Sequence, residues 1–180
     1  VRTARDLGAT SILPYTPEDL MSPAAELADE AYALPEGSSY TDAAAVLELA
    51  RTTGADAIHP GYGCRSETAD FAEQVERSGF VFIGPRPESI RLMGDKVSAK
   101  HAMIEAGVPC VPGSDGALPD GPPEILQTAD KVGYPVIIKA SGGGGGRGMR
   151  VVEKKEDLIK SVEMTKAEAG AAFGNPMVYM

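Results

Sequence analysis

The stretch Pro135-Val136-Ile137-Ile138-Lys139, with the five consecutive glycines at residues 142–146 and the apolar run at 149–152, decides how the second half of this chain folds. Both apolar runs are rich in Val and Ile and are bounded by glycine, which is typical of strands rather than helices. We therefore predict two strands joined by a glycine-rich flap.

The glycine run is suited to holding phosphate. Glycine lacks a Cβ atom, so its amide N–H can approach a ligand closely, and several such amides can point the same way. Lys139 would add a positive charge beside them, and we expect the anion to be a nucleoside triphosphate. A Walker loop or a dinucleotide fingerprint needs a helix after its glycines, whereas residues 147–149 lead into a strand. The remaining alternative is a flexible linker, although linkers usually have polar flanks.

Composition limits the class of protein. The 180 residues are 43% apolar and 24% charged, as in a globular chain with one ordinary core or two small ones. The net charge of −9, with scattered basic residues, disfavours binding to nucleic acid or to an anionic membrane.

The sequence contains neither an apolar run of membrane-spanning length nor an opening secretory signal, so we expect a cytoplasmic or organelle-matrix protein. Cys64 and Cys110 lack short-spaced partners, which predicts reduced thiols rather than a zinc site.

Residues 1–85 alternate between apolar runs and helical segments. We predict strands at 9–15, 30–34, 56–59 and 80–83, and helices at 41–53 and 66–78. Repeated β-then-α units imply a parallel sheet with right-handed crossovers, as in a Rossmann-like half-domain.

The two predicted helices of this half show apolar stripes. In helix 41–53 we expect Ala44, Leu47 and Ala50 to be buried and Gly54 to end the helix. In helix 66–78 we expect Ser66 to cap the N-terminus, and Phe71 and Val75 to face inward.

The remaining segments predict a connection and a second lobe. Two linking helices are expected within residues 86–110, the first from Pro87 and the second at 96–106, followed by a surface loop at 117–123. We then expect a helix at 124–132, the flap hairpin, a helix at 155–171 and a last strand at 177–180. The chain opens without Met on the end of a helix and stops on an apolar strand, so we expect a piece of a larger protein.

A loop of His59-Pro60-Gly61-Tyr62-Gly63 follows the predicted strand 56–59. Loops at the carboxyl ends of parallel strands commonly line substrate crevices, and position alone leaves a substrate wall and a tight turn equally open. Glu67 could serve the same site or merely favour the dipole of the next helix.

Several segments, taken in order, resemble the biotin carboxylase family of the ATP-grasp superfamily across essentially the whole chain. They are His59-Pro60-Gly61-Tyr62-Gly63 with Ser66-Glu67, Phe82-Ile83-Gly84-Pro85, Met93-Gly94-Asp95-Lys96, Ala106-Gly107-Val108-Pro109 with Pro112-Gly113-Ser114-Asp115-Gly116, and residues 133–140 running into 142–149. The resemblance implies an α/β chain truncated at both ends. Its Rossmann-like pre-ATP-grasp lobe would span residues 1–85, linking helices 86–110, and the small α+β lid lobe of an ATP-grasp fold 111–180.

The resemblance also implies an activity. Enzymes of this family cleave ATP to activate bicarbonate, via carboxyphosphate, and carboxylate biotin that is held on a biotin carboxyl carrier protein or domain. Magnesium assists, and the full-length enzymes are often homodimers. The magnesium ligands and the catalytic residues would lie after Met180, so this chain alone should bind ATP weakly and be inactive. The resemblance does not separate acetyl-CoA carboxylase of fatty acid synthesis from pyruvate, acyl-CoA or urea carboxylases, and a plastid or mitochondrial location is open in a eukaryote.

Site residues follow from the same resemblance. Lys96, Lys139, Gly145 and Gly146 would contact ATP, and Arg147 would serve the flap or the phosphates. Ile137 and Met149 would either line the adenine slot or belong to the strand core. His59, Tyr62, Gly63 and Glu67 would lie beside bicarbonate and biotin. No metal ligand is assigned.

The sequence departs from the family pattern in several places. Cys64-Arg65 replaces an aromatic and an aliphatic residue, Thr68 stands where Asn is usual, segment 20–25 is unlike the common pattern and loop 35–39 is short. We therefore expect a divergent branch. Two alternatives stay open: another ATP-grasp ligase, such as a carbamoyl-phosphate synthetase half, and a non-catalytic nucleotide-binding protein.

Overall fold

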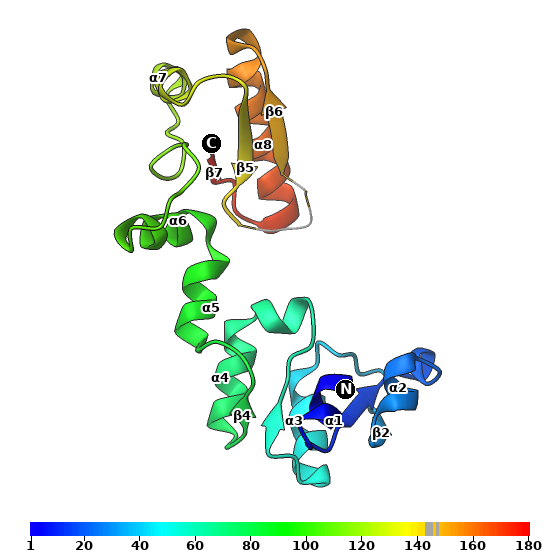
Figure 1. The fold of residues 1–180 in the computed structure, drawn as a ribbon. Helices are drawn as coiled ribbons and strands as arrows, with labels where there is room; N and C mark the ends of the chain where they lie inside the picture. Colours follow the sequence, from blue (N-terminus) through cyan, green and yellow to red (C-terminus); the bar gives the residue numbers. More distant parts are fainter. Residues whose placement is uncertain (143–145, 147) are drawn as a thin grey trace. The chain divides into compact units, whose positions relative to one another are not determined.

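The computed structural model describes residues 1–142, 146 and 148–180, and their contacts divide the chain into two compact units, Val1–Arg91 and Leu92–Met180 (Figure 1). Each unit has its own apolar core and is described by itself. The domain limits at residues 85 and 110 stay a prediction, because a division by contacts does not test them.

The first unit alternates short strands and helices, which confirms the predicted α/β class. Its elements are α1 (Arg2–Asp6), β1 (Ile12–Tyr15), η1 (Pro17–Asp19), α2 (Pro23–Leu27), β2 (Glu30–Ala33), α3 (Ala43–Thr53), β3 (Ala57–Ile58), η2 (Cys64–Glu67), α4 (Ala69–Arg77), β4 (Val81–Phe82) and the start of α5 (Pro87–Gly94). α2 and η1 were not predicted; each is a single turn or little more and begins at a proline.

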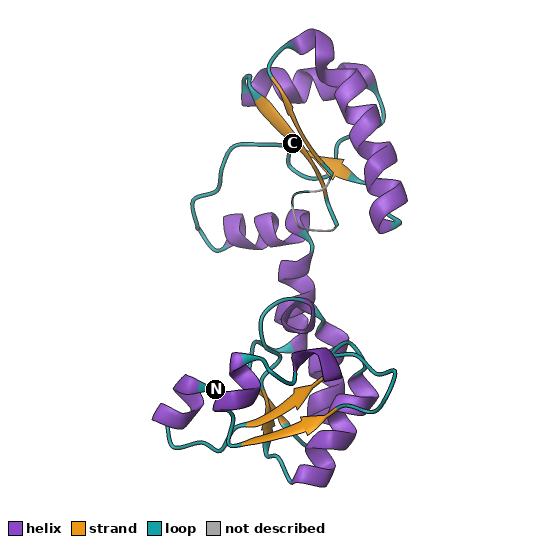
Figure 2. Ribbon diagram, turned by 90° about the vertical axis from the view of Figure 1, so that its right-hand side faces the viewer, coloured by secondary structure: helices purple, strands orange, loops and turns teal. Residues whose placement is uncertain are grey.

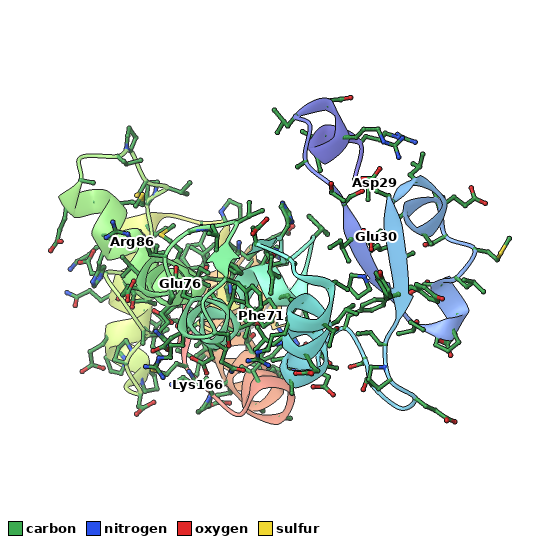
Figure 3. All side chains as sticks on the ribbon, turned by 90° about the horizontal axis from the view of Figure 1, so that it is seen from below. Asp29, Glu30, Phe71, Glu76, Arg86 and Lys166 are labelled. Carbon is green, nitrogen blue, oxygen red and sulfur yellow. The ribbon has the colours of Figure 1, made fainter. Side chains whose placement is uncertain are left out.

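The strands of the first unit are parallel, as predicted, but they form two separate two-stranded sheets rather than one. β1 pairs with β2 from Ile12↔Glu30 to Tyr15↔Ala33, and β3 pairs with β4 through Ala57↔Val81 and Ile58↔Phe82. Asp29, labelled in Figure 3, lies just before β2. Its carboxylate accepts hydrogen bonds from Ser11 N (2.8 Å) and Ser11 Oγ (2.7 Å), which joins the starts of β1 and β2. These bonds hold the pKa of Asp29 below its usual value.

The core of the first unit lies around α4. Phe71 and Val75 face inward as predicted, and the Phe71 ring packs edge-on against Phe82 with centroids 6.3 Å apart. In α3 the buried alanine near the start is Ala45, while Ala44 is exposed, because packing against the rest of the unit, and not the local pattern, sets which side of the helix faces inward. The predicted cap of α4 is also wrong: Ser66 Oγ donates to Gly63 O (2.7 Å) within η2, which occupies the turn before α4.

The second unit contains a three-stranded antiparallel sheet in the order β6-β5-β7. Its strands are β5 (Val136–Ala140), β6 (Met149–Val152) and β7 (Val178–Tyr179), and its helical elements besides the end of α5 are α6 (Lys96–Glu105), α7 (Pro122–Val132), η3 (Lys155–Asp157) and α8 (Leu158–Phe173). The predicted hairpin is therefore confirmed. Figure 2 shows the long helix α8 running beside this sheet.

One face of this sheet is the core of the second unit. Val136, Ile138 and Ala140 of β5 are buried with Val152 of β6, and they pack with side chains of α7 and α8 such as Ala129, Leu158 and Val162. Ile138 and Leu158 are completely inaccessible to solvent. Ile137 and Lys139 of β5 alternate with these buried residues and lie on the opposite face of the sheet.

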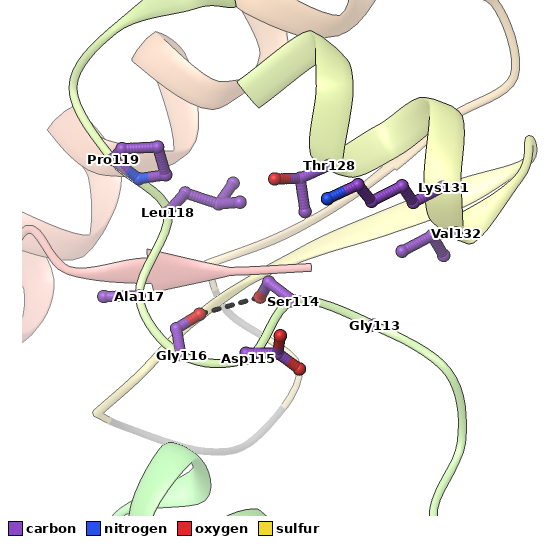
Figure 4. Close-up of a pocket in the computed structure, with 10 residues that line it drawn as sticks. All are labelled: Gly113, Ser114, Asp115, Gly116, Ala117, Leu118, Pro119, Thr128, Lys131 and Val132. Atoms are coloured by element: carbon purple, nitrogen blue, oxygen red, sulfur yellow. Dashed lines mark hydrogen bonds between the residues drawn. The ribbon is translucent and has the colours of Figure 1, made fainter. Parts of the chain in front are cut away.

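A loop at residues 113–118 supports the edge strand β7. Ser114 N donates to Met180 O (2.9 Å), Leu118 N donates to Val178 O (2.7 Å), and Met180 N donates to Ser114 Oγ (3.0 Å). Ser114 Oγ in turn donates to Gly116 O, as Figure 4 shows. The loop thus satisfies backbone groups on the free side of β7.

Candidate functional site

The outward face of the three-stranded sheet carries the residues that the sequence analysis assigned to ATP. Successive side chains of a strand point to opposite faces, so Ile137 lies opposite the buried Ile138, and Ile137 pairs across the sheet with Val151. Ile137, Met149 and Val151 are 37%, 44% and 62% exposed. The core role considered for Ile137 and Met149 is therefore wrong.

Lys139 places a positive charge on this apolar face. It follows Ile137 by two residues in the central strand, and its register partners are Met149 on β6 and Tyr179 on β7. The lysine is half-buried and stands near the end of β5 that leads into the glycine run. The face thus combines a flat apolar surface with an ammonium group, which suits a planar base and an attached anion.

The glycine run is only partly within the described residues. Gly145 and Arg147 lie outside them, so their predicted roles stay predictions. Gly146 has φ +79°, in the left-handed region that glycine tolerates, and it lies near the Met149 side chain: a Cβ built at Gly146 would stand 3.8 Å from Met149 Cε. Gly148 has φ +65°, and a Cβ there would come within 3.0 Å of the Ala140 side chain.

Lys96 begins α6 and is half-buried. The preceding Asp95 is the N-cap of this helix, since its Oδ1 accepts from Ser98 N (2.8 Å) and Ser98 Oγ (2.7 Å). The other carboxylate oxygen, Oδ2, accepts from Ser141 Oγ (2.7 Å), directly after β5. The helix start that carries Lys96 is thereby joined to the strand end that carries Lys139.

The hydrogen bonds of Asp95 favour its charged form. The bond from Ser98 N lowers the pKa of Asp95 most, followed by the bonds from the Ser141 and Ser98 hydroxyls. Burial, together with the negative charge of Asp95, raises the pKa of Tyr179. No role was predicted for Asp95 or Ser141 from the sequence. An Asp before a helix signals a cap, but its contact to a residue 46 positions away has no signature in the sequence.

The predicted substrate-side residues come together on one loop of the first unit, after β3. Gly61 N donates to His59 Nδ1 (3.0 Å), and Gly61 and Gly63 have φ +74° and +100°. Tyr62 is fully exposed, and His59 and Glu67 are also exposed. The loop therefore presents an imidazole, a phenol and a carboxylate to solvent, and its role beside bicarbonate and biotin stays a prediction.

Arg65, one of the departures from the family pattern, has a structural role. Its Nε donates to Tyr40 O (3.0 Å), and its guanidinium carbon lies 4.5 Å from the centroid of the Phe71 ring. The residue thus joins the His59 loop to the core helix α4 and to the segment before α3.

We expect Arg65→Ala to loosen this loop. A cation–π contact of a half-buried arginine and a hydrogen bond each contribute about 1 kcal/mol, so local stability should fall by about 1–2 kcal/mol. Hydrogen–deuterium exchange should show faster exchange in η2 and the first turn of α4. Arg77→Ala, at the exposed end of the same helix, is the control, and equal exchange in both variants would contradict a holding role for Arg65.

A pocket of about 300 Å³ lies between residues 113–119 and the last part of α7 (Figure 4). Thr128, Lys131 and Val132 line it from the helix. Of the described residues that were predicted to bind ATP or bicarbonate, none lines this pocket.

Among the residues that the structure describes, no group of three or more His, Cys, Asp and Glu side chains is arranged to hold a metal ion. Within the same residues, no helix has both the length and the apolar character needed to cross a bilayer.

Two family profiles match the chain. Residues 1–90 match the profile described as biotin carboxylase, N-terminal domain, and residues 95–180 match the carbamoyl-phosphate synthase L chain, ATP binding domain. The sheet face with Lys139 therefore lies in a region similar to an ATP-binding domain.

Curated relatives are similar over the whole chain. A biotin carboxylase of Pseudomonas aeruginosa is 56% identical over 183 aligned positions, which cover 100% of this chain and 41% of the relative. One of Haemophilus influenzae is 55% identical with the same coverage. The chain thus spans about two-fifths of the length of these relatives.

Solved structures agree. A biotin carboxylase of Campylobacter jejuni in complex with β,γ-ATP matches 99% of this chain and 40% of its own, with a TM-score of 0.88 and 42% identity. The biotin carboxylase domain dimer of 2-oxoglutarate carboxylase from Hydrogenobacter thermophilus, solved with MgADP, ADP and bicarbonate, matches 99% of this chain and 40% of its own, with a TM-score of 0.85 and 40% identity.

Proposed function

Because this chain belongs to the biotin carboxylase family, we propose that the full-length protein that carries it uses ATP and bicarbonate to carboxylate biotin, and that this chain supplies part of the ATP site. The observation that carries the proposal is the position of Lys139. This half-buried lysine lies on the outward sheet face with Ile137 and Met149, next to the glycine run in sequence, within the region that matches an ATP-binding domain.

In this proposal the sheet face receives the nucleotide. Ile137 and Met149 contact the adenine ring, because exposed apolar side chains on a flat sheet offer a planar base a surface that water solvates poorly. Lys139 and Lys96 contact phosphate oxygens, as do the amides of Gly145 and Gly146. Phosphoryl transfer is promoted mainly by positioning and by stabilising charge on the phosphates, which lysines and backbone amides both supply.

The remaining parts of the proposal rest on the family resemblance and on similar solved structures. Magnesium would neutralise phosphate charge, and its ligands and the catalytic residues would follow Met180 in the full-length protein. His59, Tyr62, Gly63 and Glu67 would lie beside bicarbonate and biotin, and the biotin would arrive on a carboxyl carrier protein or domain. A homodimer is proposed because one similar solved structure is described as a dimer. The proposed location is the cytoplasm, or the mitochondrial matrix or plastid in a eukaryote.

The test is substrate dependence in the full-length protein. We expect release of ADP from ATP only when bicarbonate and magnesium are present, and we expect free biotin to raise this rate. The measurement is a coupled ADP assay, with transfer of ¹⁴C from labelled bicarbonate to biotin as a second readout.

Ammonia is the informative competitor, because the match of residues 95–180 is to a domain named for carbamoyl-phosphate synthase. ATP cleavage stimulated by ammonia and unaffected by biotin would overturn the proposal and favour that ligase instead. Nucleotide binding without cleavage under any of these conditions would favour a non-catalytic role.

A further inference from the structure

The contact between Asp95 and Ser141 exceeds what a helix cap requires. Asp95 Oδ1 already caps α6 through Ser98, so Oδ2 is available for a second partner. That partner is Ser141 Oγ at 2.7 Å, 46 residues away in sequence. A carboxylate that bonds in two directions holds two elements at a fixed spacing.

Ser141 is itself held firmly. Its side chain is inaccessible to solvent, and its backbone N–H donates to Met177 O (2.9 Å), which extends the pairing of β5 with the segment before β7. Because Ser141 cannot shift without disturbing the sheet, Asp95 is positioned relative to the sheet and not merely relative to its own helix. A charge-assisted O–H···O⁻ bond of this length belongs to the stronger class of hydrogen bonds.

The two lysines assigned to ATP lie on either side of this contact. Lys96 is the residue after Asp95, and Lys139 is two residues before Ser141. Tyr179, the register partner of Lys139, is also close enough for the Asp95 charge to raise its pKa. The contact is thus a direct side-chain link between the helix start and the strand end that bear the two cations.

We infer that Asp95 and Ser141 form a positioning pair that fixes Lys96 relative to Lys139, so that both ammonium groups meet the phosphates of one bound nucleotide. This inference rests on the proposed ATP site. Neither residue needs to touch the nucleotide, because each acts through Lys96. Loss of the pair should therefore lower the affinity for nucleotide and the rate of phosphoryl transfer. The N-cap of α6 and the sheet should remain intact.

The deciding variant is Ser141→Ala in the full-length protein, because it removes the link but leaves the cap of α6 complete. We expect the Kd for MgATP, measured by calorimetry, and the KM for ATP to rise about tenfold. This is the effect expected when one charge-assisted hydrogen bond is lost. The KM for bicarbonate should stay within about twofold. Asp95→Ser is the second variant, since Ser caps a helix as well as Asp but has one oxygen and a shorter reach.

Thr165→Val is the matched control. Thr165 is equally inaccessible in the same unit, and its hydroxyl donates to Ser161 O at the same 2.7 Å. A general effect of deleting a buried hydroxyl would appear in Thr165→Val as well, whereas a positioning effect appears only in Ser141→Ala and Asp95→Ser.

Coupling to Lys96 separates positioning from a merely structural role. In a Lys96→Ala background, Ser141→Ala should weaken MgATP binding by less than about twofold further, because the group that it positions is gone. An unchanged Kd in Ser141→Ala, or a full tenfold loss that persists without Lys96, would overturn the inference. If the wild-type protein binds MgATP but shows no biotin-stimulated cleavage, the proposed function fails while the calorimetry still decides this inference. If it does not bind MgATP at all, both fail.

Discussion

Replacing Lys139 by Ala in the full-length protein is expected to lower kcat/KM for ATP by about 10²- to 10³-fold, the loss seen when one preorganised donor to a developing charge is removed. The reason is the position of the side chain. Lys139 lies in the central strand, between Met149 and Tyr179, so its ammonium cannot be replaced by a neighbouring side chain. Steady-state kinetics with varied ATP at saturating bicarbonate measures the effect.

Two controls make this result interpretable. Lys160→Ala removes an exposed lysine from α8, which packs on the other face of the sheet, and should leave kcat/KM within about twofold. Lys139→Arg keeps the charge but alters its shape and should recover only part of the activity. Tight magnesium-dependent ATP binding with the same affinity in Lys139→Ala and wild type would show that the site is assigned to the wrong lysine.

Features that depend on the local sequence pattern could be predicted before the structure was known. The hairpin around the glycine run, the parallel pairing of the first unit and the inward face of α4 follow from apolar periodicity, glycine placement and strand composition. Helix ends were predicted well where a glycine stops the helix, as at Gly54, which has the expected left-handed φ of +70°.

The misses have a common physical cause. In β5 nearly every residue is apolar, so the sequence does not show which alternate set faces the core, and only packing against α7 and α8 selects Val136 and Ile138 over Ile137. The division of the first sheet into two pairs likewise depends on which strands meet in space. The Asp95–Ser141 contact depends on tertiary structure alone.

The same reasoning explains what could be predicted of the site. Lys139 and the glycine run adjoin each other in sequence, so their chemistry could be inferred before the structure was known. The outward orientation of Met149 and the link from Lys96 to the strand end could not, because each needs two elements to be placed together.

Two adjacent isoleucines in β5 are expected to have different roles: Ile138 stabilises the core, and Ile137 contacts the nucleotide. Ile138→Ala removes a completely buried side chain from the centre of the second core, and it should lower the stability of that unit by about 2–5 kcal/mol through lost burial and the cavity left behind. Ile137→Ala removes the same atoms from a side chain that is 37% exposed, and it should cost less than about 1.5 kcal/mol. Hydrogen–deuterium exchange of α8 and β5 amides measures both.

The pair should show the reverse order in nucleotide binding. If the outward face receives the adenine ring, Ile137→Ala weakens MgATP binding although it barely changes amide exchange, because the lost surface belongs to the bound complex. Ile138→Ala, measured at a temperature where the variant is still folded, keeps that surface and should bind MgATP within about threefold of wild type. Equal destabilisation by the two substitutions would mean that the burial pattern of β5 is wrong. Unchanged affinity for MgATP in Ile137→Ala would contradict the assignment of this face to the nucleotide site, while the burial pattern of the core would still hold.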